Sequence, residues 1–181
     1  MTAAPPLELL HPLPLFYAAA GRALPEFEII EASALPPSAH RLLVHSGDMT
    51  SKLEDFFADE MILSVIQREH SPAHYRREVL LQCAKSALPV EYGAIEISLD
   101  AFDESLRCEI LAAHLPLGGL LNRHAIRYRS EPRAFLRIAP CAYLAALFQI
   151  ALPVTLYGRS NQLIAADNRV LAQIVEVLRP V

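Results

Sequence analysis

The chain has 181 residues, of which 53% are hydrophobic, and its formal net charge at pH 7 is −4. This length and hydrophobic content predict one domain with a substantial buried core. The negative balance excludes a broad cationic surface, so it argues against nucleic acid or anionic lipid as the main partner and favours a small organic ligand.

The N-terminal part of the chain mixes apolar residues with prolines over residues 7–35, which predicts short helices that wrap a core. Ser51 and Glu54 have the spacing of a capping box, in which Ser51 begins a helix and Glu54 reaches back to it. Helices are predicted over 38–44 and 51–58.

From residue 61 onward β-branched residues become frequent, which favours strands. Strands are predicted over 61–67, 75–83, 90–99, 124–129, 134–138, 160–165 and 170–178. Helices are predicted over 103–113, 116–122 and 141–152. Asp167 and Asn168 supply a hairpin turn between the last two strands. Neighbouring strands without regular βαβ alternation indicate a single α+β domain, a mainly antiparallel sheet with helices laid on it.

One segment resembles a membrane span. No charged residue occurs between Arg137 and Arg159, a stretch nearly long enough to cross a bilayer. Pro140 and Pro153 interrupt it, and the apolar run between them is too short to span a membrane. We therefore expect a buried helix here and no membrane span.

The cysteines and the N-terminus indicate the compartment. Cys83, Cys108 and Cys141 are an odd number without close pairing, so we expect free thiols in a reducing environment. Residues 1–6 lack the basic stretch and apolar run of a secretory signal. These features predict a cytoplasmic protein.

Two charged residues fall on apolar faces of predicted strands. Side chains alternate along a strand, so Glu176 shares its face with apolar residues of 170–178, and Arg77 does the same within 75–83. An unpaired buried charge is costly, so Arg77 and Glu176 either pair with each other, line a cavity with a polar ligand, or lie on faces less buried than the pattern implies. In a cavity, Arg77 would bind a carboxylate through its planar fork, and Glu176 would face the uncharged or hydroxylated end of the ligand.

Five short blocks follow one another within residues 42–180. They are Gly47-Asp48-Met49-Thr50-Ser51-Lys52-Leu53-Glu54, Arg77-Glu78-Val79-Leu80-Leu81, Pro116-Leu117-Gly118, Leu156-Tyr157-Gly158-Arg159 and Val175-Glu176-Val177-Leu178. Their order and spacing resemble the chorismate pyruvate-lyase family, whose members eliminate pyruvate from chorismate to give 4-hydroxybenzoate. Residues 1–41 precede the matched region and are expected to wrap the same domain.

The resemblance implies an antiparallel sheet with helical flaps that close over a buried ligand, and neither a metal nor an organic cofactor. It assigns substrate contacts to Met49, Arg77, Leu117 and Glu176, with Glu176 and Arg77 as the catalytic pair. Strand alternation selects two of these four residues independently. We expect chorismate as the substrate and a monomeric protein.

Three features bear on that resemblance. Gly93-Ala94 stands where enterobacterial members carry Gly-Arg, so a positive charge near the site is missing. The segment 132–153 also looks longer than the corresponding segment in those members. His70 and His74 have the spacing of two zinc ligands on a helix, but Pro72 lies between them, so no helical zinc site is expected.

Two other functions compete with the lyase. Effector-sensing domains of some bacterial transcription regulators share this fold by resemblance, so a non-catalytic domain that binds an aromatic acid is the alternative. The first 35 residues offer no helix-turn-helix or basic face for DNA. The other rival is nucleic-acid binding by arginines with interleaved aromatic rings, which the net charge opposes. These residues are Arg123, Arg127, Arg129, Arg133, Arg137, Tyr128 and Phe135.

Overall fold

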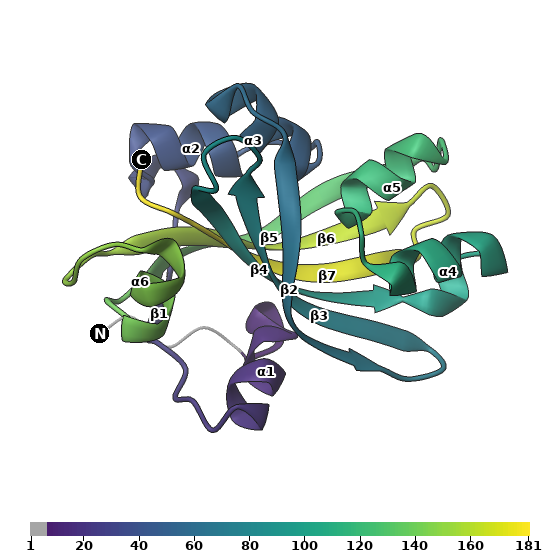
Figure 1. The fold of residues 1–181 in the computed structure, drawn as a ribbon, viewed down its shortest axis with the longest axis horizontal. Helices are drawn as coiled ribbons and strands as arrows, with labels where there is room; N and C mark the ends of the chain where they lie inside the picture. Colours follow the sequence, from purple (N-terminus) through teal and green to yellow (C-terminus); the bar gives the residue numbers. More distant parts are fainter. Residues whose placement is uncertain (1–6) are drawn as a thin grey trace.

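Seven strands form one antiparallel sheet in the order β1-β5-β6-β7-β4-β3-β2 (Figure 1). The computed structural model describes residues 7–181, so the prediction made for residues 1–6 lies outside it. The strands are β1 (Phe27–Ile30), β2 (Met61–His70), β3 (His74–Cys83), β4 (Pro89–Ser98), β5 (Tyr128–Ile138), β6 (Leu156–Ala165) and β7 (Val170–Leu178). The predicted α+β domain with an antiparallel sheet is confirmed.

Six α-helices and three short 3-10 helices accompany the sheet within residues 7–181. They are η1 (Leu7–Leu10), α1 (Leu13–Ala19), η2 (Ala32–Ala34), α2 (Pro37–Leu43), α3 (Met49–Phe57), η3 (Leu99–Ala101), α4 (Glu104–Ala112), α5 (Leu117–Arg123) and α6 (Ala142–Phe148).

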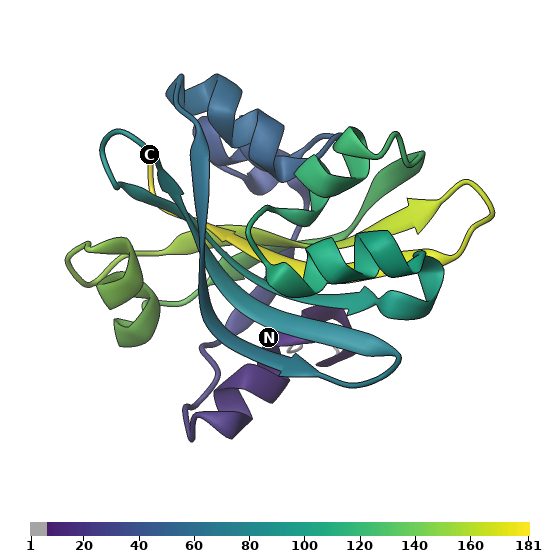
Figure 2. The same ribbon diagram turned by 45° about the vertical axis from the view of Figure 1, so that its right-hand side comes forward.

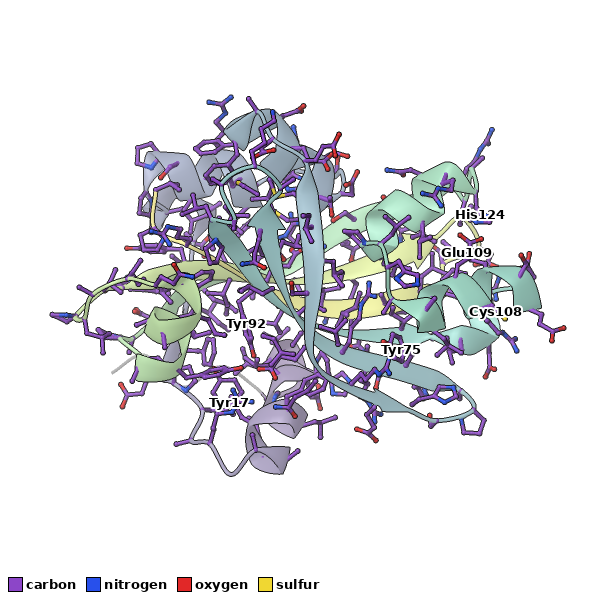
Figure 3. All side chains as sticks on the ribbon, in the orientation of Figure 1. Tyr17, Tyr75, Tyr92, Cys108, Glu109 and His124 are labelled. Atoms are coloured by element: carbon purple, nitrogen blue, oxygen red, sulfur yellow. The ribbon has the colours of Figure 1, made fainter. Side chains whose placement is uncertain are left out.

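The helices cover both faces of the sheet (Figures 1 and 2). α1 and α6 pack on one face, where their apolar residues meet Leu80, Tyr92 and Val175 of the strands. α2 and α3 pack on the opposite face over one end of the sheet, and α4 and α5 pack on that same face over the other end. Figure 3 shows Tyr17 and Tyr92 on the side of α1 and α6, with Tyr75 on the side of α4. We call these the α1/α6 face and the α3/α5 face.

The N-terminus of α3 differs from the predicted capping box. Asp48 is the N-cap, and its side chain accepts a hydrogen bond from the Ser51 backbone N–H at 2.8 Å. The Ser51 hydroxyl donates to the same carboxylate, while Glu54 accepts from the Met61 backbone N–H. The prediction was wrong because a carboxylate three residues earlier stabilises the helix start by both hydrogen bonding and charge.

Two strand predictions also need correction. Residues 128–129 of the predicted strand 124–129 and the whole predicted strand 134–138 belong to one strand, β5, whose register shifts between Pro132 and Ala134. Residues 124–127 lie outside β5, because α5 continues to Arg123 and a turn follows it. A proline is tolerated there because a bulge leaves one residue outside the ladder. β1, which the sequence did not predict, is a four-residue strand paired with β5.

The apolar segment between Pro140 and Pro153 contains α6, as predicted, although the helix is shorter than expected. Leu144, Ala145 and Phe148 are its buried residues and pack against the sheet. Among residues 7–181, no helix has the length and apolar character needed to cross a membrane.

Candidate ligand-binding site

A pocket lies on the α3/α5 face, beneath the N-termini of α3 and α5. Its empty volume is about 580 Å³, a value that includes the open solvent at its mouth. The sheet contributes its floor through Leu63, Arg77, Val79, Leu81, Glu91, Gly93, Ile95, Asn161, Leu163, Ile174 and Glu176. The α3 and α5 regions and β5 contribute Gly47, Asp48, Met49, Thr50, Pro116, Leu117, Gly118 and Ser130.

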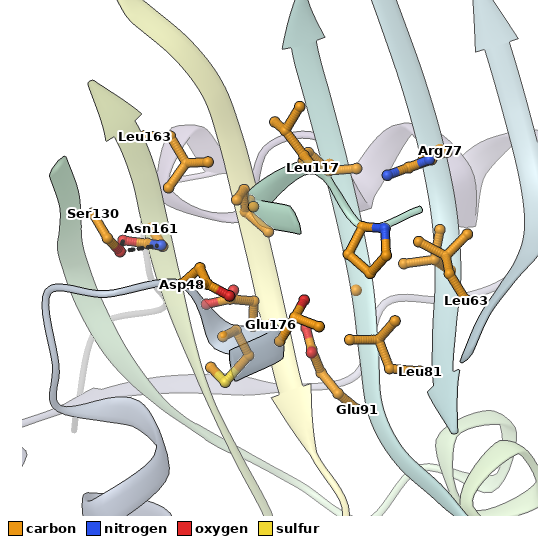
Figure 4. A pocket seen from close by; sticks show the side chains of 18 of the residues that line it. Asp48, Leu63, Arg77, Leu81, Glu91, Leu117, Ser130, Asn161, Leu163 and Glu176 are labelled. Atoms are coloured by element: carbon orange, nitrogen blue, oxygen red, sulfur yellow. Dashed lines mark hydrogen bonds between the residues drawn. The ribbon is translucent and has the colours of Figure 1, made fainter. Parts of the chain in front are cut away.

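All four residues selected from the sequence line this pocket. Met49 is the first residue of α3 and Leu117 the first residue of α5, while Arg77 lies on β3 and Glu176 on β7. Figure 4 shows Arg77 at the upper right of the pocket, with Leu117 beside it, and Glu176 lower in the view between Asp48 and Glu91. The fold therefore brings together positions that are up to 127 residues apart in the chain.

The two helix N-termini over the pocket contact each other. A Cβ atom on Gly118 would lie 2.7 Å from the Cβ of Asp48, so only glycine permits this approach. Asn122 of α5 also donates a hydrogen bond to the Asp48 carboxylate at 3.2 Å. Through these contacts, the first and third sequence blocks, residues 47–54 and 116–118, together close one side of the pocket.

Arg77 is a buried cation without an acidic partner among the described residues. Only 2% of its surface is exposed, and its Nη2 donates to the Leu115 carbonyl at 3.2 Å. Its Nε and Nη1 have no hydrogen-bond partner among the described residues, although the Tyr75 hydroxyl partly offsets the effect of burial on the Arg77 pKa. Burial lowers the pKa of Arg77, yet a guanidinium keeps its charge in proteins. The side chain therefore offers two free donors and an uncompensated positive charge.

Glu176 pairs with Arg159 and not with Arg77. Arg159 stands directly opposite Glu176 in the β6–β7 ladder, and its Nε donates to Glu176 Oε2. Arg159 Nη1 donates to the carbonyls of Leu43 at 2.9 Å and His45 at 3.3 Å. The predicted option of an ion pair between Arg77 and Glu176 is wrong. The partner was missed because the predicted strand began at residue 160, one position after Arg159.

The backbones of β6 and β7 approach closely beside this pair. A Cβ on Gly158 would lie 2.3 Å from the Glu176 carbonyl oxygen, so any larger residue would force the strands apart. The glycine of the fourth sequence block therefore fixes the distance at which Arg159 reaches Glu176.

Glu91 on β4 is a second buried carboxyl group in the pocket, which the sequence analysis missed. It is 5% exposed, and its Oε2 has no hydrogen-bond partner among the described residues. Burial, together with the negative charge of Glu176, raises the pKa of Glu91 well above its usual value, and Arg159 offsets only part of this effect. Strand alternation would have found it, because Glu91 shares a face with Gly93 and Ile95.

The remaining sequence observations fall elsewhere. Ala94 packs in the core of the α1/α6 face, so its side chain points away from the pocket. His70 and His74 lie at the facing ends of β2 and β3, not on a helix. Within residues 7–181 no group of three or more potential ligands is placed to hold a metal ion. Cys83, Cys108 and Cys141 are free.

Comparisons with known proteins show the fold. No protein-family model and no curated protein sequence matches the chain. Among solved structures, PhnF from Mycobacterium smegmatis aligns with a TM-score of 0.59 and 14% identity, over 77% of this chain and 66% of that chain. The separate effector domain of PhnF aligns with a TM-score of 0.56 and 13% identity, over 74% of this chain and 88% of that domain.

A third solved structure, the Bacillus subtilis protein YydK, is described as a possible transcriptional regulator. It aligns with a TM-score of 0.55 and 8% identity, over 76% of this chain and 63% of that chain. This chain thus spans less than two thirds of full-length PhnF and YydK. At these identities the likeness shows the fold alone, a chorismate lyase-like α+β domain also used by regulator effector domains.

Proposed function

We propose that the pocket binds a small carboxylic acid whose carboxylate is held by Arg77. The observation that carries this proposal is the pair of unpartnered donors on a guanidinium that is 2% exposed. An isolated buried charge is strongly unfavourable, and a bidentate carboxylate would satisfy both its charge and its donors.

The rest of the pocket suits a ligand that has a ring in the middle and a polar group at each end. β4 separates β3 from β7, so the backbones that carry Arg77 and Glu176 lie about 10 Å apart across the sheet. Side chains that lie between them are apolar, including Val79, Ile95 and Ile174. A six-membered ring with a carboxylate at one end and a hydroxyl group at the other suits this arrangement.

Two uses of such a pocket are compatible with its geometry. A non-catalytic effector-binding domain is the first, and the effector domain of PhnF, which has the same fold, favours it. Chorismate pyruvate-lyase activity is the second, and the presence of Met49, Arg77, Leu117 and Glu176 on one pocket favours it.

In the lyase reaction, the ring carbon that bears the hydroxyl group loses its hydrogen, and the neighbouring C–O bond to the enolpyruvyl group breaks. The ring becomes aromatic, and the released enolpyruvate takes up a proton to become pyruvate. Arg77 would clamp a carboxylate, while Glu176, held in place by Arg159, would accept a hydrogen bond from the ring hydroxyl. The enzyme would act by positioning one reactive conformer.

Binding is tested by titration calorimetry with 4-hydroxybenzoate. Arg77→Leu should weaken the affinity by about 100-fold or more, because it removes a desolvated charge partner. Arg68→Leu is the matched control, since Arg68 faces Arg77 in register on β2 but is exposed and outside the pocket. Equal affinities of the wild type and the Arg77 variant would refute the proposal.

Turnover is tested by incubation with chorismate and identification of the products by chromatography and mass spectrometry. Formation of 4-hydroxybenzoate and pyruvate, reduced about 10²–10⁴-fold by Glu176→Gln, would identify a lyase in which Glu176 handles a proton. Tight binding of 4-hydroxybenzoate without chorismate turnover would identify an effector-binding domain.

A further inference from the structure

We infer that Glu91 is a specificity-determining residue of this pocket, which together with Glu176 selects carboxylic acids that carry a hydroxyl group at the end remote from Arg77. The inference rests on the proposed function, since it concerns the far end of the same ligand. Neither strand alternation as applied to the sequence nor the lyase resemblance selects this residue.

The geometry of three neighbouring strands brings the two carboxyl groups together. Glu176 on β7 stands opposite Arg159 on one side and opposite Gly93 on the other. Glu91 lies two residues from Gly93 on β4 and therefore on the same face. Because Gly93 has no side chain, the β4 position directly opposite Glu176 places no side chain between the two carboxyl groups.

The Glu91 side chain leans across this glycine. Its Oε1 lies 3.4 Å from the position that a Cβ on Gly93 would take. Figure 4 shows Glu91 and Glu176 near each other and Arg77 at a distance from both. The pocket thus has one cationic end and one end with two carboxyl groups.

The charges around Glu91 determine which form of the carboxyl group the ligand meets. Glu176 and Arg159 are the two charged groups that act on its carboxyl group, Glu176 by repulsion and Arg159, which is paired with Glu176, by attraction. Arg77 on β3 and Asp48 at the start of α3 are the other charged residues that line the pocket. Since Glu176 takes the guanidinium of Arg159, the buried Glu91 is left without a cation of its own, and burial together with Glu176 raises its pKa and favours its protonated form.

A hydroxyl group matches this pair because it both donates and accepts. It would donate to the Glu176 carboxylate and accept from the protonated Oε2 of Glu91, the atom that has no partner within residues 7–181. An amino group attached to an aromatic ring donates but accepts poorly, and an unsubstituted ring does neither. Leaving the Glu91 donor unpaired costs free energy, so both alternatives should bind more weakly.

The experiment compares three probes, 4-hydroxybenzoate, 4-aminobenzoate and benzoate, by titration calorimetry. The wild type should prefer 4-hydroxybenzoate over benzoate by about 10-fold or more, the range expected for a site built to bond a hydroxyl group. In Glu91→Leu this preference should fall to a few-fold through lost affinity for 4-hydroxybenzoate, while benzoate binding stays the same or improves. Glu91→Gln should retain most of the preference, because the amide still donates.

Controls separate specificity from a structural effect. Glu96→Gln changes a buried carboxyl group on the same strand that faces away from the pocket, so the preference should not change. Melting curves identify any variant that does not fold. If Glu91→Leu fails, Glu91→Met takes its place, because methionine is close to glutamate in shape and has no donor.

The outcomes also separate this inference from the proposed function. If no probe binds the wild type, both fail together. If all three bind through Arg77 and the preference for the hydroxyl group is the same in Glu91→Leu as in the wild type, the inference about Glu91 is overturned and the carboxylate site remains.

Discussion

The two faces of the sheet each bury a glutamate, and the environments of these two residues are opposite. Glu78 on β3 points to the α1/α6 face and is 0% exposed. Its carboxylate accepts hydrogen bonds from the hydroxyls of Tyr92 at 2.6 Å and Tyr143 at 2.9 Å, and from Arg22 at 3.3 Å. Glu91, on the neighbouring strand and the α3/α5 face, leaves one oxygen without a partner.

The arginines of the two faces differ in the same way. Arg22 pairs with Glu78 and stacks on the Tyr143 ring, with 3.7 Å between the guanidinium carbon and the ring centroid. Arg77 has no acidic partner among the described residues, and its guanidinium carbon is 6.0 Å from the Tyr75 ring centroid. On the α1/α6 face both oxygens of Glu78 are paired, although Arg22 Nε and the Tyr17 hydroxyl have no partner among the described residues, whereas on the α3/α5 face the buried cation Arg77 has no acidic partner. Paired charges hold a fold together, and an unpaired buried charge indicates a ligand. We therefore interpret the α1/α6 face as structural and propose that the ligand binds on the α3/α5 face.

The largest expected effect is on stability when the hydrogen-bond network around Glu78 is broken. Glu78→Leu leaves Arg22 and two tyrosine hydroxyls without their acceptor, so the free energy of unfolding should fall by about 3 kcal/mol or more. Glu91→Leu, its counterpart on the other face, should cost less than about 1 kcal/mol, because the lost oxygen had no partner. Urea denaturation of both variants measures the difference. Equal losses would contradict the distinction between the two faces.

A smaller effect of opposite sign is expected at Arg77. Arg77→Leu removes an unpaired buried charge and loses one hydrogen bond to the Leu115 carbonyl, so the free energy of unfolding should be unchanged or rise by about 1 kcal/mol. The same variant should lose the ligand. A loss of about 3 kcal/mol without ligand would mean that Arg77 supports the fold and would remove the main argument for a carboxylate site.

The sequence contained enough local information for most of the fold. Alternation predicted β7 with its observed bounds, and it placed Arg77 and Glu176 on one face of the sheet. β1 was not predictable in this way, because four residues become a strand only through pairing with β5, more than a hundred positions later. The α3 cap was missed because two good capping residues lie three positions apart, and the local pattern does not decide between them.

Only part of the site could be predicted from the sequence, because its ion pairs depend on how the strands pair. A charge on an apolar face shows in the sequence, but its partner depends on which strands are neighbours and in which register. Arg159 meets Glu176 only because β6 and β7 pair with those two residues opposite each other. Glu91 could have been found from the sequence, because residues 90–99 were predicted as a strand and side-chain alternation places Glu91 on the same face as Gly93 and Ile95.

The smallest expected effect is a change of the free energy of unfolding with pH, which depends on whether Glu91 is protonated in the folded protein. A carboxyl group whose pKa is raised in the folded state stabilises the fold below its unfolded pKa of about 4.3, and this stabilisation is lost as pH rises toward the folded pKa. Relative to Glu91→Gln, which cannot ionise, the wild type should therefore become less stable with increasing pH above about 4.3. The change can be at most about 1.4 kcal/mol for each pH unit.

Taking the difference between wild type and Glu91→Gln removes the titration of other groups. His45 is the main one nearby, since burial and Arg159 lower its pKa to about 4, and its contribution to stability runs in the opposite direction, falling as pH drops below about 6.5. Melting temperatures of both proteins at intervals from pH 5 to pH 8 give the slope. A flat difference over this range would mean that Glu91 is ionised in the folded protein. The far end of the pocket would then carry an uncompensated negative charge and would favour a cationic group over the hydroxyl group argued above.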